Sequence, residues 1–537
     1  MLVRLPRRSS STDKLGTIQR TRQLIAFVLL FLLACSSGTP EFFVLDARES
    51  PAQITLQGGD QGASFWVIPF SSNTSNVQAQ ADYAVNPSIA SGPYRAMEDK
   101  VFHEKNLRRR TLLALEGLRG RINAQNLRIK DLYRKNPATN GLGAENLSIV
   151  SPFQGDAGNT ISAKLLATSG VANIYVDSRY ESEMTQASAD RLLRNYSTIT
   201  LPRLRTFFGQ ESDIDGNGKI NIFFSSPEKI GTNVVGFFQP LDLLPLTTSN
   251  QQEIVYVRIP DQIYPEELFD ATLAHEAFHL INFGQKSLKI LMQTNGQSIV
   301  TEDTFLNEGL AHLAEEITGW GVCTVIVTKK YLECLQKTSL AGLGDSKLGN
   351  CAIFSPDGDS LARRGGAMLF LLYLFQQTGG AVYSEALAGD VSGAGITLLN
   401  QMNRSPTTGL KNIESSSGRS FFIWYADFVA AVAVDSTTTL SPSRFRFDDV
   451  VTDTFTHLPR NIRMSIARVD PSGDTYEITG PADFREITAA ESIPSPTPLY
   501  FTGANFFKLS ISPGGEKRLV FSDTDHLGLG ATVIKIP

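Results

Sequence analysis

The sequence is poor in cysteine and in charged residues. Only four of its 537 residues are cysteine and only 19% are charged, with a formal net charge of −5. This charge balance offers nucleic acid no basic surface, so we expect no nucleic-acid partner. The chain shows no internal repeat, but its 42% apolar content is that of a globular protein with a large core and two or three domains.

A long hydrophobic run near the N-terminus is also missing. The apolar run from Leu24 to Ala34 has 11 residues, which is too short to cross a membrane with confidence. Six basic residues precede it, as in a signal peptide, and we expect residues 1–34 to be removed. The remaining chain would carry 43 basic residues against 53 acidic ones, a net charge of −10.

The residue after this run is Cys35, and LLAC resembles a bacterial lipobox. Lipid attachment to Cys35 would anchor an extracytoplasmic protein to a bacterial membrane or cell surface, whereas ordinary signal cleavage would secrete it. Three further cysteines remain, Cys323, Cys334 and Cys351. Any two of them could form a disulfide in an exported protein, and no pair has the CxxC spacing of a structural zinc site.

The chain does contain HEAFH at residues 275–279. His275 and His279 are four residues apart, so on a helix both imidazoles lie on one face and reach a single metal ion, with Glu276 beside them. Glu266 and Glu267 lie in the first turn expected for that helix, where acidic residues are favourable. An accidental HExxH occurs in roughly one such chain in a few hundred, so a third ligand must support the prediction.

Glu308 is the candidate third ligand. It lies 29 positions beyond His279, in NEGLAHLAEE, at the start of a second amphipathic run. The apolar side of this run consists of Leu306, Leu310, Leu313 and Ile317. A zinc ion with three protein ligands keeps an open position at which it activates water and polarises a carbonyl, and Glu276 would take the proton of that water.

HEAFHLINF together with FLNEGLAHLAEE resembles the gluzincin zinc peptidases, and within them the hyicolysin-type family, over about residues 165–435. The resemblance implies Zn²⁺ as cofactor, His275, His279 and Glu308 as its ligands, and Glu276 as the general base. Asn307 and Glu315 match positions of the second motif, where they would orient the ligands or brace the helix.

Two roles near the metal stay open. His312 lies one turn after Glu308, where it either faces the ligands and substrate or simply packs. The oxyanion donor is unassigned, because related chains carry a Tyr shortly before a Gly where this chain has Arg363 and Arg364. Other candidates for this role are Tyr331, Tyr373 and Tyr425.

The segment DIDGNGK resembles the first half of an EF-hand calcium loop. Its Ca²⁺ ligands would be Asp213, Asp215, Asn217 and Asn221, with the carbonyl of Lys219. The twelfth position of the loop is Phe224 instead of the usual bidentate Glu. A tight Asx and Gly turn that enters a strand explains the same residues without a metal, so both interpretations stand.

The hydrophobic pattern predicts an α+β protein. Strands are expected at 172–177, 219–224, 234–239 and 253–259, and helices at 186–208, 366–377 and 418–435. With the resemblance, this predicts a zincin-like two-lobe catalytic domain, with a twisted sheet and helices above, a helical lobe below, and flanking all-β modules. The strand at 234–239 would be either a sheet edge that pairs with substrate or a plain hairpin.

We divide the chain into five segments on composition. They are a signal peptide at 1–34, a β module and linker at 35–92, a basic helix and linker at 93–160, the catalytic domain at 161–440 and a β module at 441–537. The basic helix either is solvated or contacts anionic lipid headgroups.

These observations predict a zinc-dependent endopeptidase that cleaves extracytoplasmic proteins, with polypeptide substrates and a membrane contact through its lipid anchor. The alternative is a lipid-anchored binding or adhesion protein on an inactive zincin scaffold. The intact Glu276 argues against that alternative, because zinc binding alone does not require it.

Overall fold

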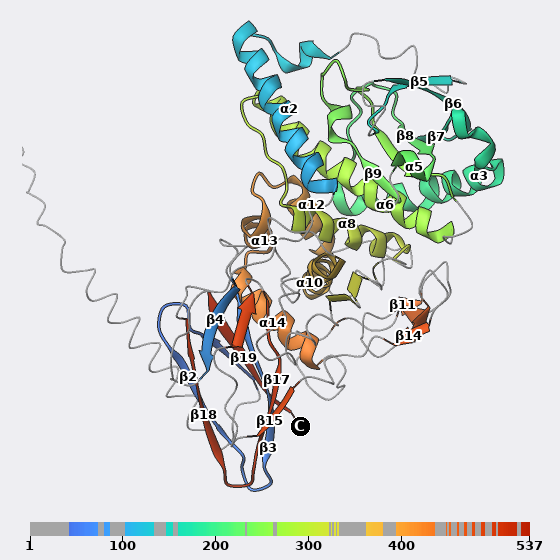
Figure 1. Ribbon diagram of the computed structural model, residues 1–537. Helices are drawn as coiled ribbons and strands as arrows, with labels where there is room; N and C mark the ends of the chain where they lie inside the picture. Colours follow the sequence, from blue (N-terminus) through green and yellow to red (C-terminus); the bar gives the residue numbers. More distant parts are fainter. Residues whose placement is uncertain are drawn as a thin grey trace, which may run out of the picture.

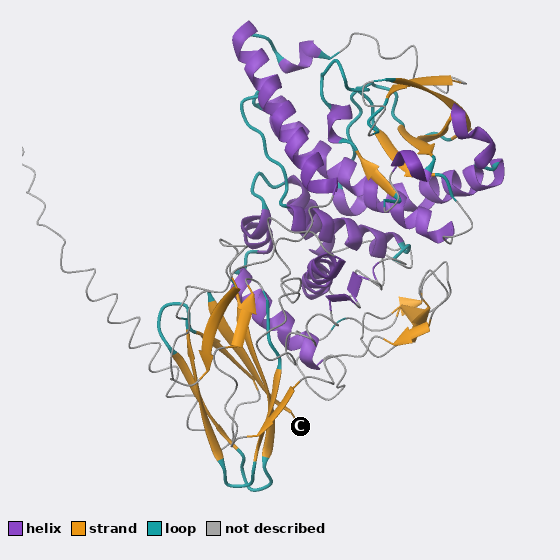
Figure 2. Cartoon of the chain, in the orientation of Figure 1, coloured by secondary structure: helices purple, strands orange, loops and turns teal. Residues whose placement is uncertain are grey.

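The computed structural model describes residues 42–72, 80–85, 103–133, 146–153, 159–230, 234–260, 266–321, 324, 327–328, 330–331, 361–379, 394–434, 447, 451–452, 459–460, 467–469, 475–477, 485–488, 497–500, 503–523 and 528–536. Within them the chain combines a mixed sheet covered by helices, a group of further helices, and separate, mainly antiparallel β-sheets (Figures 1 and 2). The α+β class is therefore confirmed.

The mixed sheet contains the strands predicted ahead of HEAFH. Its order is β5-β6-β7-β8-β10-β9, and β7, β8 and β10 run parallel while β9 is antiparallel at the edge. The strands are β5 (Asn146–Val150), β6 (Thr160–Thr168), β7 (Ala172–Asp177), β8 (Ile220–Ser225), β9 (Gly236–Phe238) and β10 (Ile254–Arg258). The sheet begins within the segment expected to be a linker, because β5 and β6 form an antiparallel pair next to β7.

Both faces of this sheet are buried, because alternating side chains of each strand pack into two different cores. Ile174 and Val176 of β7 join the core shared with the helices, whereas Tyr175 faces the opposite side. There it joins Tyr256 and Phe153 in a second, smaller core. Successive side chains of a strand point to opposite faces, so a strand buried on both sides has the nearly continuous apolar sequence seen here.

The helix predicted at 186–208 is present, but its middle segment is π-helical instead of α-helical. It consists of α3 (Gln186–Asn195), a five-residue π-helical stretch (Tyr196–Thr200) and α4 (Leu201–Phe208). Pro202 lies at the start of α4, where its missing backbone N–H removes one helical hydrogen bond. The helix ends at Gly209, whose φ of 93° suits glycine.

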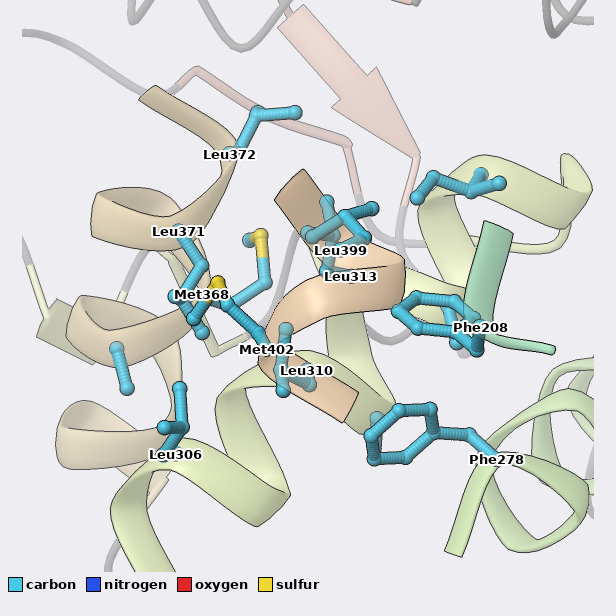
Figure 3. Close-up of a cluster of buried hydrophobic side chains, with 14 of the residues drawn as sticks. Phe208, Phe278, Leu306, Leu310, Leu313, Met368, Leu371, Leu372, Leu399 and Met402 are labelled. Carbon is cyan, nitrogen blue, oxygen red and sulfur yellow. The ribbon is translucent and has the colours of Figure 1, made fainter. Parts of the chain in front are cut away.

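The remaining helices of the catalytic part lie on the sheet or below it. They are α5 (Pro227–Ile230), α6 (Glu266–Asn282), a π-helical extension (Phe283–Leu288), α7 (Lys289–Gln293), α8 (Thr304–Thr318), α10 (Leu361–Gly379), α12 (Ala394–Arg404), α13 (Gly409–Ser417) and α14 (Phe421–Val434). Figure 3 shows side chains of α4, α6, α8, α10 and α12 meeting in one apolar cluster, which includes Phe278, Leu310 and Met402. The helices predicted at 366–377 and 418–435 are thus confirmed as α10 and α14.

The basic helix is α2 (His103–Gln125), followed by a 3₁₀ turn (Ile129–Leu132). Leu115, Leu118 and Ile122 are buried, and Ile122 lies within 2.6 Å of the position that a Cβ at Gly296 would take. The side chain of Gln297 donates to Asn123 at 2.6 Å. One face of α2 therefore packs on the catalytic part, at the turn that follows α7.

The two terminal β segments pair with each other, although the sequence presented them as separate modules. Blue N-terminal and red C-terminal strands alternate in Figure 1, in the sheets β1-β19-β3-β17-β15 and β16-β4-β18-β2. The strands are β1 (Phe42–Asp46), β2 (Ala52–Gln57), β3 (Ala63–Ser71), β4 (Gln80–Val85), β15 (Arg485–Thr488), β16 (Thr497–Tyr500), β17 (Phe507–Ile511), β18 (Glu516–Ser522) and β19 (Leu529–Ile536). Two small hairpins consist of β11 (Val451–Thr452) with β12 (Pro459–Arg460) and β13 (Ala467–Val469) with β14 (Thr475–Glu477).

Helix α14 joins this β module to the helices. The hydroxyl of Thr532 on β19 donates to the carbonyl of Ala426 at 3.1 Å, and Phe70 on β3 contacts Phe422 and Tyr425. Glycine is required at 530, since a Cβ there would lie 2.4 Å from the Phe70 ring. Among the helices of the described residues, none has both the length and the hydropathy needed to span a membrane.

Candidate metal centre

Helix α6 presents the HEAFH motif toward α8. His275 and His279 lie on one side of α6, with their ring centroids 4.8 Å apart, and the His275 side chain is only 10% exposed. Acidic Glu266 and Glu267 begin the helix, where they favourably oppose its dipole. The four-residue spacing thus places both imidazoles side by side, as predicted.

Helix α8 carries Glu308 to the same place. Its C-terminus is closed by Gly319 in the left-handed conformation, with the Trp320 amide donating to the Glu315 carbonyl at 2.9 Å. Gly309 allows a close approach to α10, because a Cβ there would lie 2.8 Å from Leu371 Cδ1 and 2.9 Å from Ala367 Cβ. The Gly of the NEG motif therefore has a packing role next to Glu308.

The three predicted ligands converge. Glu308 Oε2 lies 3.4 Å from His275 Nε2, and Glu308 Oε1 lies 3.2 Å from His279 Nε2. Ligand atoms about 2.0 to 2.1 Å from a tetrahedral zinc ion lie roughly 3.3 Å apart. Two imidazoles and one carboxylate at these separations form a buried group that could hold a metal ion, and the donor set suits zinc.

Arg364 also belongs to this site, through an ion pair that could not be predicted from the sequence. Its Nη1 lies 2.5 Å from Glu308 Oε2, so the arginine of SLARRGG pairs with a predicted metal ligand. Burial would raise the pKa of Glu308, but Arg364 and the two histidines together hold that pKa well below its usual range. Glu308 is thus kept in the ionised form that a metal requires.

Glu315 lies between His275 and His312 and contacts the ring nitrogen of His275 that does not face Glu308. Its Oε1 lies 2.7 Å from His275 Nδ1 and 2.8 Å from His312 Nδ1. Burial opposes ionisation of Glu315, yet the adjacent histidines lower its pKa to about 2. Burial likewise opposes the charged form of His275, but Glu308 and Glu315 raise the pKa of His275 well above its ordinary value. Glu315 therefore orients His275, and His312 reaches that ligand through Glu315.

Glu276 faces the edge strand of the sheet. Its Oε2 accepts a hydrogen bond from the backbone N–H of Phe238 on β9 at 2.9 Å. Gly236 of the same strand packs directly on α6, since a Cβ there would lie 2.6 Å from Thr272 Cγ2. The predicted strand at 234–239 is therefore the edge strand β9, held against the helix that carries the HEAFH motif.

Other side chains considered from sequence lie elsewhere. Tyr331, Tyr373 and Tyr425 are all fully buried, and the rings of Tyr373 and Tyr425 pack against Phe428 of α14. Asn307 is half-buried on α8, and within the described part of the chain no hydrogen bond of its side chain reaches His275, His279 or Glu308.

The predicted calcium ligands do not all come together. Asn221 lies within β8, where its side chain accepts from Asn173 and donates to Gln252, so it does not face the DIDGNG loop and the expectation for it is wrong. A residue in a strand points across the sheet, whereas an EF-hand ligand lies in a loop. Asn217 folds back within its own turn, accepting from the Lys219 amide at 2.6 Å. The residue that approaches Asp213 and Asp215 is Glu253.

The four cysteines, Cys35, Cys323, Cys334 and Cys351, lie outside the described residues. The lipobox and any disulfide therefore stay predictions from sequence.

Comparison with known proteins finds a distant relative of part of this chain. No model of a known protein family matches the chain. A stretch of 158 residues is 28% identical to neutral metalloprotease ShpI of Staphylococcus hyicus, which covers 27% of this chain and 34% of the relative. The match therefore spans about a third of the length of that curated protein. Together with the buried histidine and glutamate group, this distant similarity suggests a metallopeptidase.

Proposed function

We propose that this protein is a zinc-dependent endopeptidase of the gluzincin type. The observation that carries the proposal is the convergence of His275, His279 and Glu308 from two helices, with Glu276 directed to the sheet edge beside them. The likeness to a neutral metalloprotease supports the same chemistry. In this proposal the mixed sheet with α6 forms an upper lobe, and α8, α10, α12 and α14 form a lower one.

In this proposal each side chain of the site has a distinct role in peptide hydrolysis. His275, His279 and Glu308 would hold the zinc ion, which when bound polarises the scissile carbonyl and makes water more acidic. Glu276 acts as general base toward the attacking water and returns the proton to the leaving amine. Glu315 fixes the orientation of His275, and Arg364 keeps Glu308 ionised.

Edge strand β9 is the proposed binding site for the substrate backbone. Among the described strands it pairs with β10 alone, and Phe238 directs its N–H away from β10 toward Glu276. An extended peptide that adds to this edge would lie beside Glu276. Recognition through backbone hydrogen bonds explains an endopeptidase with loose side-chain preference.

Replacement of the general base tests the proposal. We expect wild-type protein to cleave casein and to contain zinc, whereas Glu276→Gln should retain zinc and lose about 10²- to 10⁴-fold in kcat. Glu267→Gln makes the same chemical change at an exposed position of α6 and should leave activity intact. If wild-type protein binds zinc but cleaves no peptide in a diverse library, the enzyme is excluded and a binding protein on an inactive scaffold takes its place.

The proposed location rests on the leader sequence. A basic segment, a short apolar run and Cys35 together support export and lipid attachment to a bacterial membrane or cell surface, where the substrates would be extracytoplasmic proteins. Mass spectrometry of the mature N-terminus tests this directly. A diacylglyceryl-modified Cys35 is expected, and an unmodified terminus downstream of Cys35 would exclude the anchor while leaving secretion.

A further inference from the structure

A second acidic cluster lies away from the proposed zinc centre. Asp213 and Asp215 belong to the loop that precedes β8, and Glu253 immediately precedes β10. One carboxylate oxygen from each residue lies within 4.8 Å of the others. The loop turns tightly at Gly216 and Gly218, with φ of 73° and 67°, which allows both aspartates to face the same point.

Glu253 has a buried carboxylate oxygen that no N–H donor and no basic side chain of the described residues satisfies. The residue is 1% exposed, and its Oε1 accepts from the Ile214 amide at 3.0 Å. Its Oε2 is buried without a hydrogen-bond partner among the described residues. Burial raises the pKa of Glu253 to about 7, although hydrogen bonds from the Ile214 amide and the Ser212 side chain lower it. Burial also raises the pKa of Asp215 to about 6, and a neighbouring carboxylate adds to both increases. Such a group is costly to bury unless a positive charge compensates it.

No basic side chain of the described residues supplies that charge. Within the described part of the chain, no Lys or Arg forms an ion pair with Asp213, Asp215 or Glu253. Lys219, the nearest in sequence, points to the sheet instead and donates to Thr168 Oγ1 at 2.9 Å and Asn173 Oδ1 at 3.3 Å. Three acidic groups thus converge around an orphan oxygen without a protein cation.

We propose that Asp213, Asp215 and Glu253 form a structural calcium site. Glu253 supplies from a distant segment the glutamate that the twelfth position of the loop lacks, where the sequence has Phe224. Calcium prefers six to eight oxygen ligands, which loop carbonyls and water would complete, whereas magnesium is usually held by only one or two carboxylates. The all-oxygen set also disfavours zinc, which prefers nitrogen and sulfur.

The position of the site predicts what calcium does there. The loop leads into β8, and Glu253 leads into β10, the neighbour of β8 and of β9. A cation shared by both segments would fix the ends of these strands and so stabilise the sheet whose edge faces Glu276. Its effect would appear as stability of the fold, independent of the reaction at the zinc centre.

Calcium titration of the zinc-loaded, full-length protein tests the proposal. After removal of calcium on a chelating resin, isothermal titration with CaCl₂ should show one site with a dissociation constant on the order of 10⁻⁵ to 10⁻³ M. Millimolar CaCl₂ should also raise the midpoint of thermal unfolding, and MgCl₂ should do so less. Glu253→Gln and Asp215→Asn should each weaken calcium binding at least about tenfold and reduce the rise in midpoint.

The control is Glu228→Gln, an equivalent change at an exposed position of α5, which should bind calcium like the wild type. Zinc content should stay unchanged in all four proteins, which separates this site from the catalytic proposal. The inference is overturned if the wild type binds no calcium, or if Glu253→Gln binds it as tightly as the wild type. Neither outcome would bear on the peptidase activity.

Discussion

The contact between β9 and α6 can be tested by adding a single methyl group. At Gly236, a Cβ would lie 2.6 Å from Thr272 Cγ2, 2.9 Å from the Tyr256 carbonyl oxygen and 3.5 Å from Glu276 Cγ. The Tyr256 oxygen belongs to the backbone of β10, and Thr272 is held by its hydroxyl, which donates to the Leu268 carbonyl at 2.8 Å. Neither neighbour can move freely, so Gly236→Ala must displace β9 from α6.

The magnitude follows from the cost of overpacking a rigid contact, about 1 to 3 kcal/mol. If the strand stays in place, this cost lowers the free energy of unfolding by that amount. If the strand moves, the Phe238 amide leaves Glu276, and loss of this hydrogen bond to a charged group, about 1.5 to 3 kcal/mol, lowers kcat/KM by about 10- to 150-fold. Zinc content should not change in either case, because the zinc ligands lie on α6 and α8 and not on β9.

Thr272→Ser provides the matched rescue. It removes Cγ2, the nearest atom to the added methyl, and keeps the hydroxyl that bonds Leu268. Alone it should behave nearly like the wild type, and combined with Gly236→Ala it should recover part of the lost activity or stability. Urea unfolding and peptide hydrolysis on the four proteins measure both quantities. Wild-type stability and activity in Gly236→Ala would refute the close packing of β9 on α6.

Four further substitutions test other parts of the site and fold. Gly309→Ala should lower the free energy of unfolding by about 1 to 3 kcal/mol, because the added methyl group would overlap α10. Gly117 is exposed on α2 with open space around it, so Gly117→Ala should raise the free energy of unfolding by up to about 1 kcal/mol. Urea titrations measure both changes. Glu315→Gln should weaken zinc binding about 10- to 100-fold in a chelator competition, because it loses the charged contact to His275 Nδ1. Burial raises the pKa of Asp242 to about 6 from 3.8 in the unfolded chain, so the folded protein binds the extra proton and its stability should fall as pH rises from about 4 to 6. This slope, up to about 1.4 kcal/mol per pH unit, should be smaller in Asp242→Asn.

Local pattern was enough to predict most elements around the site. Strands β7, β8 and β10 and helices α6, α8, α10 and α14 follow from apolar periodicity, since each element buries a continuous stripe or face. The pair His275 and His279 follows from helical spacing alone. Glu308 was a candidate from its place in the second amphipathic run, but its assignment as a ligand required the resemblance, because its distance to the histidines depends on how α8 packs on α6.

Contacts between distant segments could not be predicted in the same way. The pairing of β1 and β3 with β19 depends on which strand edges meet, whereas alternation in sequence shows only which face is buried. The role of Glu253 was missed for the same reason, because the loop motif extends forward along the chain and its acidic partner comes from another strand. Arg364 stands where related chains carry a Tyr, but its partner Glu308 lies on another helix, so the ion pair could not be predicted from the sequence.

The electrostatics of the proposed zinc centre explain why its ligands are ready to receive a cation. Glu308 and Glu315 are both buried, and buried carboxylates remain ionised only where positive charge compensates them. Arg364 supplies one such charge, and protonation of His275, whose pKa is raised, supplies another. A divalent ion bound by His275, His279 and Glu308 would supply the same compensation and displace the proton from His275. The carboxylates of the NEG helix therefore favour positive charge at this position whether a proton or a metal provides it.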